Sequence, residues 1–248
     1  MSQVIFYNRP EPVNKDLHRN LKLDVSRTDL SFAAKTNSVP LAGAEFQHAV
    51  REYPIVFLQG PDQSILATAL LGVRNDENLF IGADGRWNAT YVPAFVRRYP
   101  FILASNETQP DQMTVCLDGA WSGFNTEQGE PLFDENGAPS TLMNNTIRFL
   151  QECQNGYQQT EQFIKRLQEM DLLVTLTAQV ETGNGQKFAI QGLMAVDEKK
   201  LLALDEANTL KLFRSGELGW IYAHLLSLGN INRLVQLLAA RHPAGVRP

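Results

Sequence analysis

The chain has 248 residues, of which 44% are hydrophobic and 9% aromatic, and its formal net charge is −5. A chain of this size buries a core large enough to need neither a disulfide nor a metal for stability. The acidic balance disfavours nucleic-acid binding, which requires a basic face that neutralises phosphates. The longest apolar runs, such as 66–73, have about eight residues, whereas a membrane-spanning helix needs about twenty.

The first 40 residues are predicted to form an irregular N-terminal segment of short strand-like pieces and polar connectors. Residues 43–53 are expected to form a short helix with its apolar side chains on one face. Two β-rich runs, 54–58 and 65–73, then flank the turn residues Gly60-Pro61-Asp62. This pattern predicts a hairpin of central strands. A third strand is expected at 79–81.

The middle of the chain is predicted to contain a short helix, a strand and a long loop. Proline fits a first helical turn but forbids continuation, so Pro93 and Pro100 bracket a short helix. Residues 112–118 form a predicted strand. The polar stretch 119–140 is rich in glycine and proline. A connector of this length is usually functional or disordered, so we interpret it as a loop or linker.

The clearest pattern in the sequence predicts a long amphipathic helix that begins after the N-cap residue Ser140. Apolar residues recur at spacings of three and four and form one stripe. They are Met143, Ile147, Leu150, Cys153, Tyr157, Thr160, Ile164 and Leu167. A second hairpin is expected at 174–180 and 188–196, because hydrophobic and polar residues alternate around Gly183-Asn184-Gly185.

The C-terminal part is predicted to be mostly helical. Asp197 and Asp205 are expected to cap two short helices, and Asn230 a last helix that ends near residue 241. Residues 219–227 are interpreted as a strand, and 242–248 as a flexible tail. Because hairpins dominate and strands do not alternate with helices, the fold class is α+β, with a mainly antiparallel sheet in a single domain.

No pattern of catalytic or metal-binding residues appears. The histidines His18, His48, His224 and His242 lack zinc-site spacing, and no nucleophile elbow or phosphate loop is present. Cys116 and Cys153 are interpreted as buried, unpaired thiols, which suit a reducing compartment. Since the N-terminus also lacks signal-peptide features, we expect a cytoplasmic protein without metal or cofactor.

The segment from Asp84 to Arg98 is the candidate binding region, because it concentrates the residue types that binding hot spots favour. An alternative is that its aromatic residues pack in the core while its arginines pair with nearby carboxylates. The candidate binding residues are Asp84, Arg86, Trp87, Tyr91, Arg97 and Arg98.

Several stretches resemble, in matching order, the SapC family of bacterial proteins, which is named for a supposed role in surface-layer formation. The matching stretches lie between roughly residues 40 and 240 and include YPIVFL at 53–58, DGRW at 84–87, YVPAFVRRYPF at 91–101, GEPLFD at 129–134, GLMAVDEKKL at 192–201 and IYAHLLSL at 221–228. The resemblance implies genetic companions such as flavin-dependent halogenase-like proteins, cupin-like proteins and TonB-dependent receptors. It supplies no agreed catalytic residues. Family members are often labelled peptide-transporter permeases, which the lack of a spanning segment argues against.

Three functional hypotheses remain open at this point. The first is a non-catalytic accessory or binding protein that docks a small ligand or a protein partner, such as a halogenase-like flavoprotein, through 84–98 and 119–140. The second is an enzyme, or an enzyme partner, for an aromatic or peptide substrate. Its polar candidates are His48, Asp84, Arg98, Asp118 and His224. The third is a surface-layer-related component, which rests on the family name.

Overall fold

The computed structural model describes residues 5–60, 63–105, 113–181 and 187–241, and within them it is an α+β fold. All strand pairs between the named strands are antiparallel. The largest sheet has the order β10-β11-β4-β5-β3. Its strands are β3 (Ser38–Pro40), β4 (Ile55–Gln59), β5 (Ile65–Leu70), β10 (Leu173–Glu181) and β11 (Lys187–Val196). The predicted fold class is confirmed.

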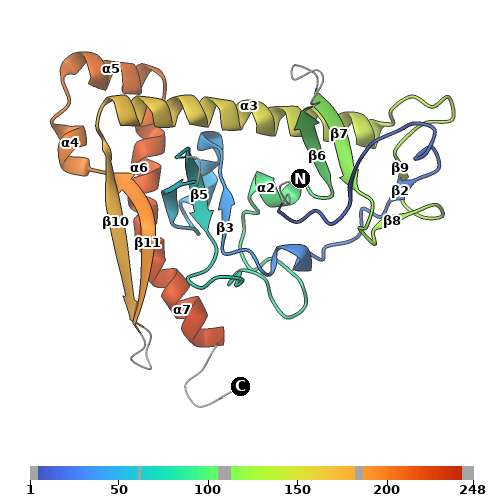
Figure 1. Ribbon diagram of the computed structural model, residues 1–248, viewed down its shortest axis with the longest axis horizontal. Coiled ribbons are helices and arrows are strands. Elements are labelled where there is room, and N and C mark those ends of the chain that lie inside the picture. Colours follow the sequence, from blue (N-terminus) through green and yellow to red (C-terminus); the bar gives the residue numbers. More distant parts are fainter. Residues whose placement is uncertain (1–4, 61–62, 106–112, 182–186, 242–248) are drawn as a thin grey trace.

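Two smaller sheets, ordered β1-β7-β6 and β8-β2-β9, lie toward the other end of the molecule (Figure 1). Their strands are β1 (Pro10–Pro12), β2 (Lys22–Leu23), β6 (Phe101–Ser105), β7 (Met113–Asp118), β8 (Phe124–Asn125) and β9 (Glu130–Pro131). The segment 119–140 therefore includes β8 and β9. It also places the buried side chains of Leu132 and Phe133 in a second apolar cluster.

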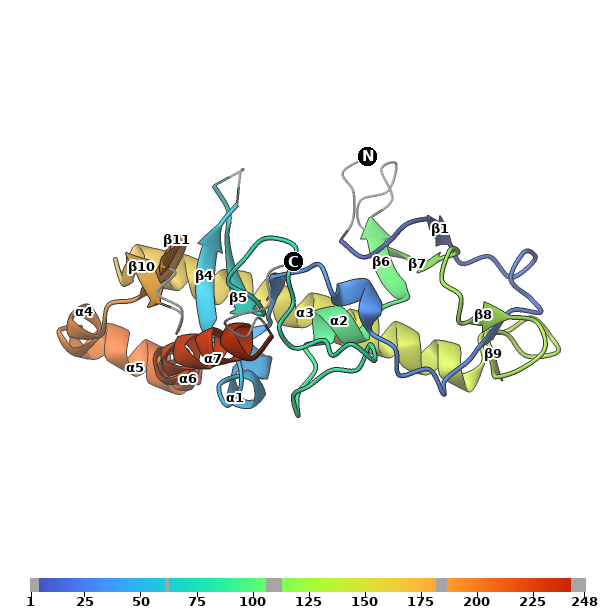
Figure 2. The ribbon, with the colours of Figure 1, turned by 90° about the horizontal axis from the view of Figure 1, so that it is seen from below.

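The longest helix, α3 (Thr141–Glu169), extends along one side of both sheet regions (Figures 1 and 2). Ser140 caps it as predicted, because the Ser140 hydroxyl accepts a hydrogen bond from the Met143 amide at 3.2 Å. Met143 and Leu150 pack into the second cluster, whereas Phe163 and Leu167 pack into the main core. One apolar stripe thus serves two packing regions.

The two predicted hairpins are confirmed in the described residues. β4 pairs with β5 from Ile55 opposite Ala69 to Gln59 opposite Ile65, and β10 pairs with β11. The turn residues 61–62 and 183–185 lie outside the described part. Asp197 and Asp205 also cap helices as predicted, each by accepting amide hydrogen bonds in the first turn.

The remaining helices are short. Of these, α6 packs against β4 and β11 of the main sheet, and α7 contacts β10 (Figure 2). The short helix expected at 43–53 is confined to residues 43–49, as η2 and α1, and α2 follows the N-cap Pro93. The elements are η1 (Ser31–Ala33), η2 (Gly43–Glu45), α1 (Phe46–Ala49), α2 (Ala94–Arg97), α4 (Glu198–Leu202), α5 (Glu206–Arg214), α6 (Glu217–Ser227), η3 (Leu228–Asn230) and α7 (Ile231–Arg241).

The strand interpretation of residues 219–227 is wrong, because they form most of α6. Glu217, Ile221 and His224 are buried at helical spacing. The run lacks an obvious polar face because its exposed side carries Tyr222 and Leu226, which are 39% and 74% exposed. A helix with apolar residues on its exposed side lacks the amphipathic pattern by which a surface helix is recognised in a sequence.

The expected strand at 79–81 is also wrong, and the role expected for Asn230 differs. The guanidinium of Arg241 donates hydrogen bonds to the carbonyls of Asn78, Leu79 and Ile81. These acceptors are therefore satisfied without a neighbouring strand.

The Asn230 amide donates to the carbonyls of Val50 and Tyr53, so it joins α7 to the end of α1 rather than capping α7.

The predicted tail at 242–248 lies outside the described residues. Across the ranges that the structure covers, no helix is both long enough and apolar enough to cross a lipid bilayer.

Candidate functional site

A groove of about 520 Å³ lies between α3 and the main sheet. We call it the α3–β5 groove. Its floor is apolar, and polar side chains of α3 stand along its rim. The floor is formed by Leu41, Ile65, Leu66, Ala67, Phe95 and Ile164, and the rim by Gln154, Gln158, Glu161, Lys165 and Gln168. This volume and composition are typical of sites that bind small molecules.

The groove is elongated along α3. Its lining extends from Gln154 to Gln168, which at the rise of an α-helix corresponds to about 21 Å. Gly156 allows η2 to approach closely, since a Cβ at this position would lie 3.1 Å from the Cβ of Ala42. The Thr160 hydroxyl fixes this approach by accepting a hydrogen bond from the Gly43 amide at 2.8 Å.

Arg98 contributes the cation nearest to one end of the groove. It follows directly after α2, and its guanidinium carbon lies 4.0 Å from the centre of the Phe95 ring. The Nε atom of Arg98 is buried and has no hydrogen-bond partner among the described residues. No acidic side chain in the described ranges forms an ion pair with Arg98. This cation therefore lacks a direct counterion.

Tyr157 contributes a second unpartnered polar atom to the same lining. Its hydroxyl is buried, again without a hydrogen-bond partner among the described residues. Burial is the largest influence on the Tyr157 pKa and raises it, Glu45 raises it further, and Arg98 lowers it. The net shift is upward, so the hydroxyl is a neutral donor at physiological pH. Tyr157 lies about one helical turn after Gln154 on α3, at the Gln154 end of the lining, and Arg98 lines the same groove.

Two buried carboxylates near Arg98 are already occupied. Glu45 accepts hydrogen bonds from the Ala42 amide, the Ala94 amide and the Tyr91 hydroxyl. Asp118 has no exposed surface. Burial raises its pKa, but hydrogen bonds from the amides of Asn8, Arg9 and Ala120 and from the Tyr99 hydroxyl together hold the pKa below its ordinary value. Both groups are therefore structural acceptors.

Tyr7 links Arg98 to the second sheet. The Tyr7 hydroxyl donates to the carbonyl of Phe101 at 2.6 Å. Burial raises the pKa of Tyr7, Arg98 lowers it, and Asp118 raises it, with a net upward shift. Tyr7 is therefore a neutral phenol whose hydroxyl is committed to the backbone.

The structure does not bring the six predicted binding residues together. Asp84 and Arg86 are exposed and form an ion pair of 3.8 Å in a turn. The Trp87 indole donates to the Tyr53 hydroxyl at 2.7 Å and packs, partly buried, against the main core. Tyr91 is anchored at both ends, because its amide donates to Glu52 and its hydroxyl to Glu45.

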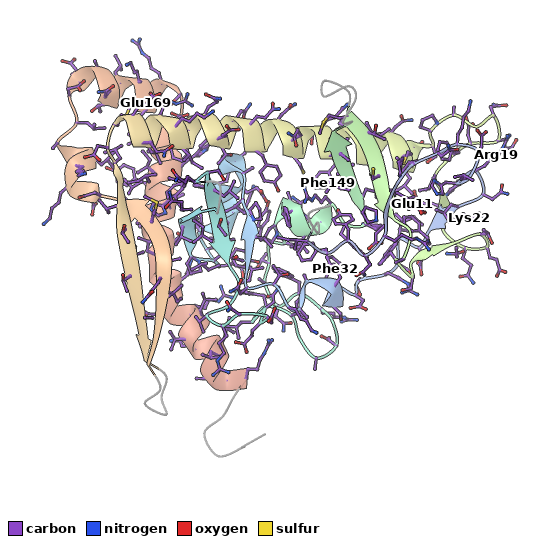
Figure 3. All side chains as sticks on the ribbon, viewed as in Figure 1. Glu11, Arg19, Lys22, Phe32, Phe149 and Glu169 are labelled. Carbon is purple, nitrogen blue, oxygen red and sulfur yellow. The ribbon has the colours of Figure 1, made fainter. Side chains whose placement is uncertain are left out.

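Arg97 and Arg98 diverge although they are neighbours in the sequence. Arg97 is exposed, and its guanidinium lies 5.1 Å from the ring centre of Phe149, which extends from α3 toward α2 (Figure 3). Arg98 lines the α3–β5 groove, and it is the one predicted binding residue that does so. The packing alternative therefore describes Trp87 and Tyr91. Arg86 also pairs with a nearby carboxylate, as that alternative expected, whereas Arg97 and Arg98 form no ion pair among the described residues.

The polar residues proposed for an enzyme are likewise dispersed. His48 is exposed on α1 and stacks on Tyr91 with ring centres 5.2 Å apart. His224 is fully buried in α6, where its Nε2 accepts from the Val196 amide at 3.0 Å and its Nδ1 lies 2.8 Å from the Ile55 carbonyl oxygen. Burial lowers the His224 pKa to about 4, against an opposing influence of the Ile55 carbonyl. The His224 imidazole is therefore neutral, makes two hydrogen bonds inside the core and has a structural role.

Cys116 and Cys153 are free and buried, as predicted. Burial raises the pKa of both thiols. Glu45 raises the pKa of Cys153 further, so that the pKa of Cys153 is about 11. Neither thiol is therefore an activated nucleophile. In the described ranges, no group of three or more histidine, cysteine or carboxylate side chains is arranged to hold a metal ion.

Tyr157 was predicted as part of the apolar stripe of the long helix, and its hydroxyl was not predicted as a candidate binding group. The available signal is chemical, because a buried tyrosine hydroxyl usually finds a hydrogen-bond partner. The rest of the groove lining comes from β3, β5, α2, the middle of α3 and the loop residues Leu41, Gln63 and Ser64. No local pattern joins these segments.

These features define an α+β protein with an elongated apolar groove beneath a long helix. The family model described as SapC matches residues 13–234 of the 248-residue chain. The chain therefore belongs to the SapC family, which confirms the sequence resemblance. Comparisons with curated proteins and with solved structures gave no match.

Proposed function

We propose that this SapC-family protein is a non-catalytic binding protein that holds a small ligand in the α3–β5 groove. The observation that carries the proposal is the coincidence of an apolar groove of about 520 Å³ with two unpartnered buried polar atoms, Arg98 Nε and Tyr157 Oη. Leaving such groups unsatisfied costs about 1–3 kcal/mol each. A ligand with a matching polar group would remove that cost.

Mass spectrometry under non-denaturing conditions tests the proposal on protein purified from its own cells. Gln158 and Gln159 provide a matched pair, because both are exposed on α3 and only Gln158 lines the groove. We expect a bound small molecule on the wild type and on Gln159→Trp, and its loss from Gln158→Trp. An equal amount of the same molecule on all three proteins would place it outside the groove.

A protein partner remains a second part of this proposal, as the sequence hypothesis of an accessory protein requires. Exposed Asp84, Arg86 and Arg97 are available to such a partner. The same purification would detect the partner as a second protein in stoichiometric amount. The absence of such a protein would contradict the accessory role while leaving ligand binding intact.

The cytoplasmic location suggested by the two free thiols is a prediction that cell fractionation tests.

A further inference from the structure

We infer that the ligand of the α3–β5 groove is a monocarboxylate with an extended apolar chain, bound with its carboxylate at Arg98 and Tyr157. This inference rests on the proposed binding function and adds the chemical class of the ligand and its orientation. It depends on the charge of the polar side chains that line the groove, the chemistry of the floor and the length of the lining.

The end near Gln154 supplies an anion site of low capacity. Arg98 has a buried Nε without a partner, and Tyr157 adds a buried, neutral hydroxyl donor. An arginine matches the planar geometry of a carboxylate and forms charge-assisted hydrogen bonds with it. A single guanidinium balances one negative charge.

The remaining charges of the groove argue against a more highly charged head group. Lys165 and Glu161 both line the rim, and they form an ion pair of 2.8 Å with each other. This part of the rim is therefore neutral. A single guanidinium without an ion-pair partner balances one negative charge, so it matches a monocarboxylate better than a dianion such as a phosphate monoester. A monoanion fits this balance.

The floor and the length of the groove define the rest of the ligand. Leu41, Ile65, Ala67 and Ile164 present hydrocarbon, which favours an apolar body over a sugar or a peptide backbone. The lining along α3 covers about 21 Å, so the body is extended rather than compact. With the carboxylate at Arg98, the chain lies along α3 toward Gln168.

Titration calorimetry with decanoate and with decanol tests the inference on the full chain. The two probes share an apolar chain and differ in the carboxylate. We expect decanoate to bind about tenfold or more tightly than decanol, because a hydrogen bond to a charged group contributes about 1.5–3 kcal/mol. Arg98→Met should remove this difference and leave decanol affinity unchanged. The matched control Lys165→Met removes the same charge from the rim and should keep the preference.

Tyr157→Phe provides a second variant that removes one oxygen atom and keeps the ring, so it tests the inference even if Arg98→Met disturbs folding. We expect about tenfold weaker decanoate binding with unchanged decanol binding. Equal affinities of the wild type for the two probes, or equal effects of Arg98→Met and Lys165→Met on decanoate, would overturn the carboxylate inference while the groove still binds a ligand. Binding of neither probe would also overturn it, and the molecule that co-purifies with the wild type would then decide the proposed function separately.

Discussion

Replacing Asp118 with alanine is expected to lower the free energy of unfolding by about 3 kcal/mol. The Asp118 carboxylate is fully buried at the end of β7 and accepts hydrogen bonds from the amides of Asn8, Arg9 and Ala120. It also accepts one from the Tyr99 hydroxyl at 3.0 Å. Alanine leaves these donors without their acceptor, and a donor that loses its partner costs about 1–3 kcal/mol when buried. Because water reaches these amides in part, the total cost is lower than the sum of the costs for fully buried donors.

Urea denaturation of the wild type and two controls measures this effect. Asp118→Asn keeps one acceptor oxygen for two of the four donors but replaces the other with an NH2 donor, so it should also destabilise the protein. Asp16→Ala removes a carboxylate from an exposed position and should change stability by less than about 0.5 kcal/mol. If Asp118→Ala were as stable as Asp16→Ala, the carboxylate would not hold the N-terminal segment to β7.

Lowering the pH from 6.5 to 4 is expected to reduce the free energy of unfolding by about 3 kcal/mol through His224 alone. Burial lowers the pKa of His224 from 6.5 to about 4 in the folded state. Between these values the unfolded chain binds a proton that the folded chain does not bind, so stability rises with pH in this window and falls as the pH is lowered. Each unit of pKa difference corresponds to about 1.4 kcal/mol.

The difference between the wild type and His224→Gln isolates this contribution, because carboxylates titrate equally in both proteins. Stability measured at several pH values should decline more steeply below pH 6.5 in the wild type. His48→Gln alters an exposed imidazole and should follow the wild-type profile. Parallel profiles for the wild type and His224→Gln would mean that the α6 imidazole titrates normally in the folded protein.

The elements that sequence analysis predicted well are those defined by local chemistry. α3 was predicted because its apolar stripe and its cap, Ser140, are contiguous in the sequence. The β4–β5 and β10–β11 hairpins were predicted for the same reason. α6 was missed because its exposed side carries the apolar residues Tyr222 and Leu226 instead of polar ones. The residues 79–81 were misassigned because the donor that satisfies their carbonyls, Arg241, lies more than 150 positions away in the sequence.

The candidate site was likewise predicted only where a local residue pattern indicates it. Arg98 was predicted from composition, as a cation among aromatic residues. The groove that gives it a role joins β5, β3 and the middle of α3, and only the folded chain brings these segments together. Trp87 and Tyr91 illustrate the opposite case, since the residue types favoured at binding sites are here anchored by Tyr53, Glu45 and Glu52.

Fluorescence titration with Nile red, a neutral apolar dye, is the most direct test that the α3–β5 groove receives a small molecule. The account predicts saturable binding of one dye per chain to the wild type and to Gln159→Trp. It predicts at least about tenfold weaker binding to Gln158→Trp, because the indole of this variant would occupy the groove. Equal affinities for all three proteins, or no saturable binding to the wild type, would contradict it.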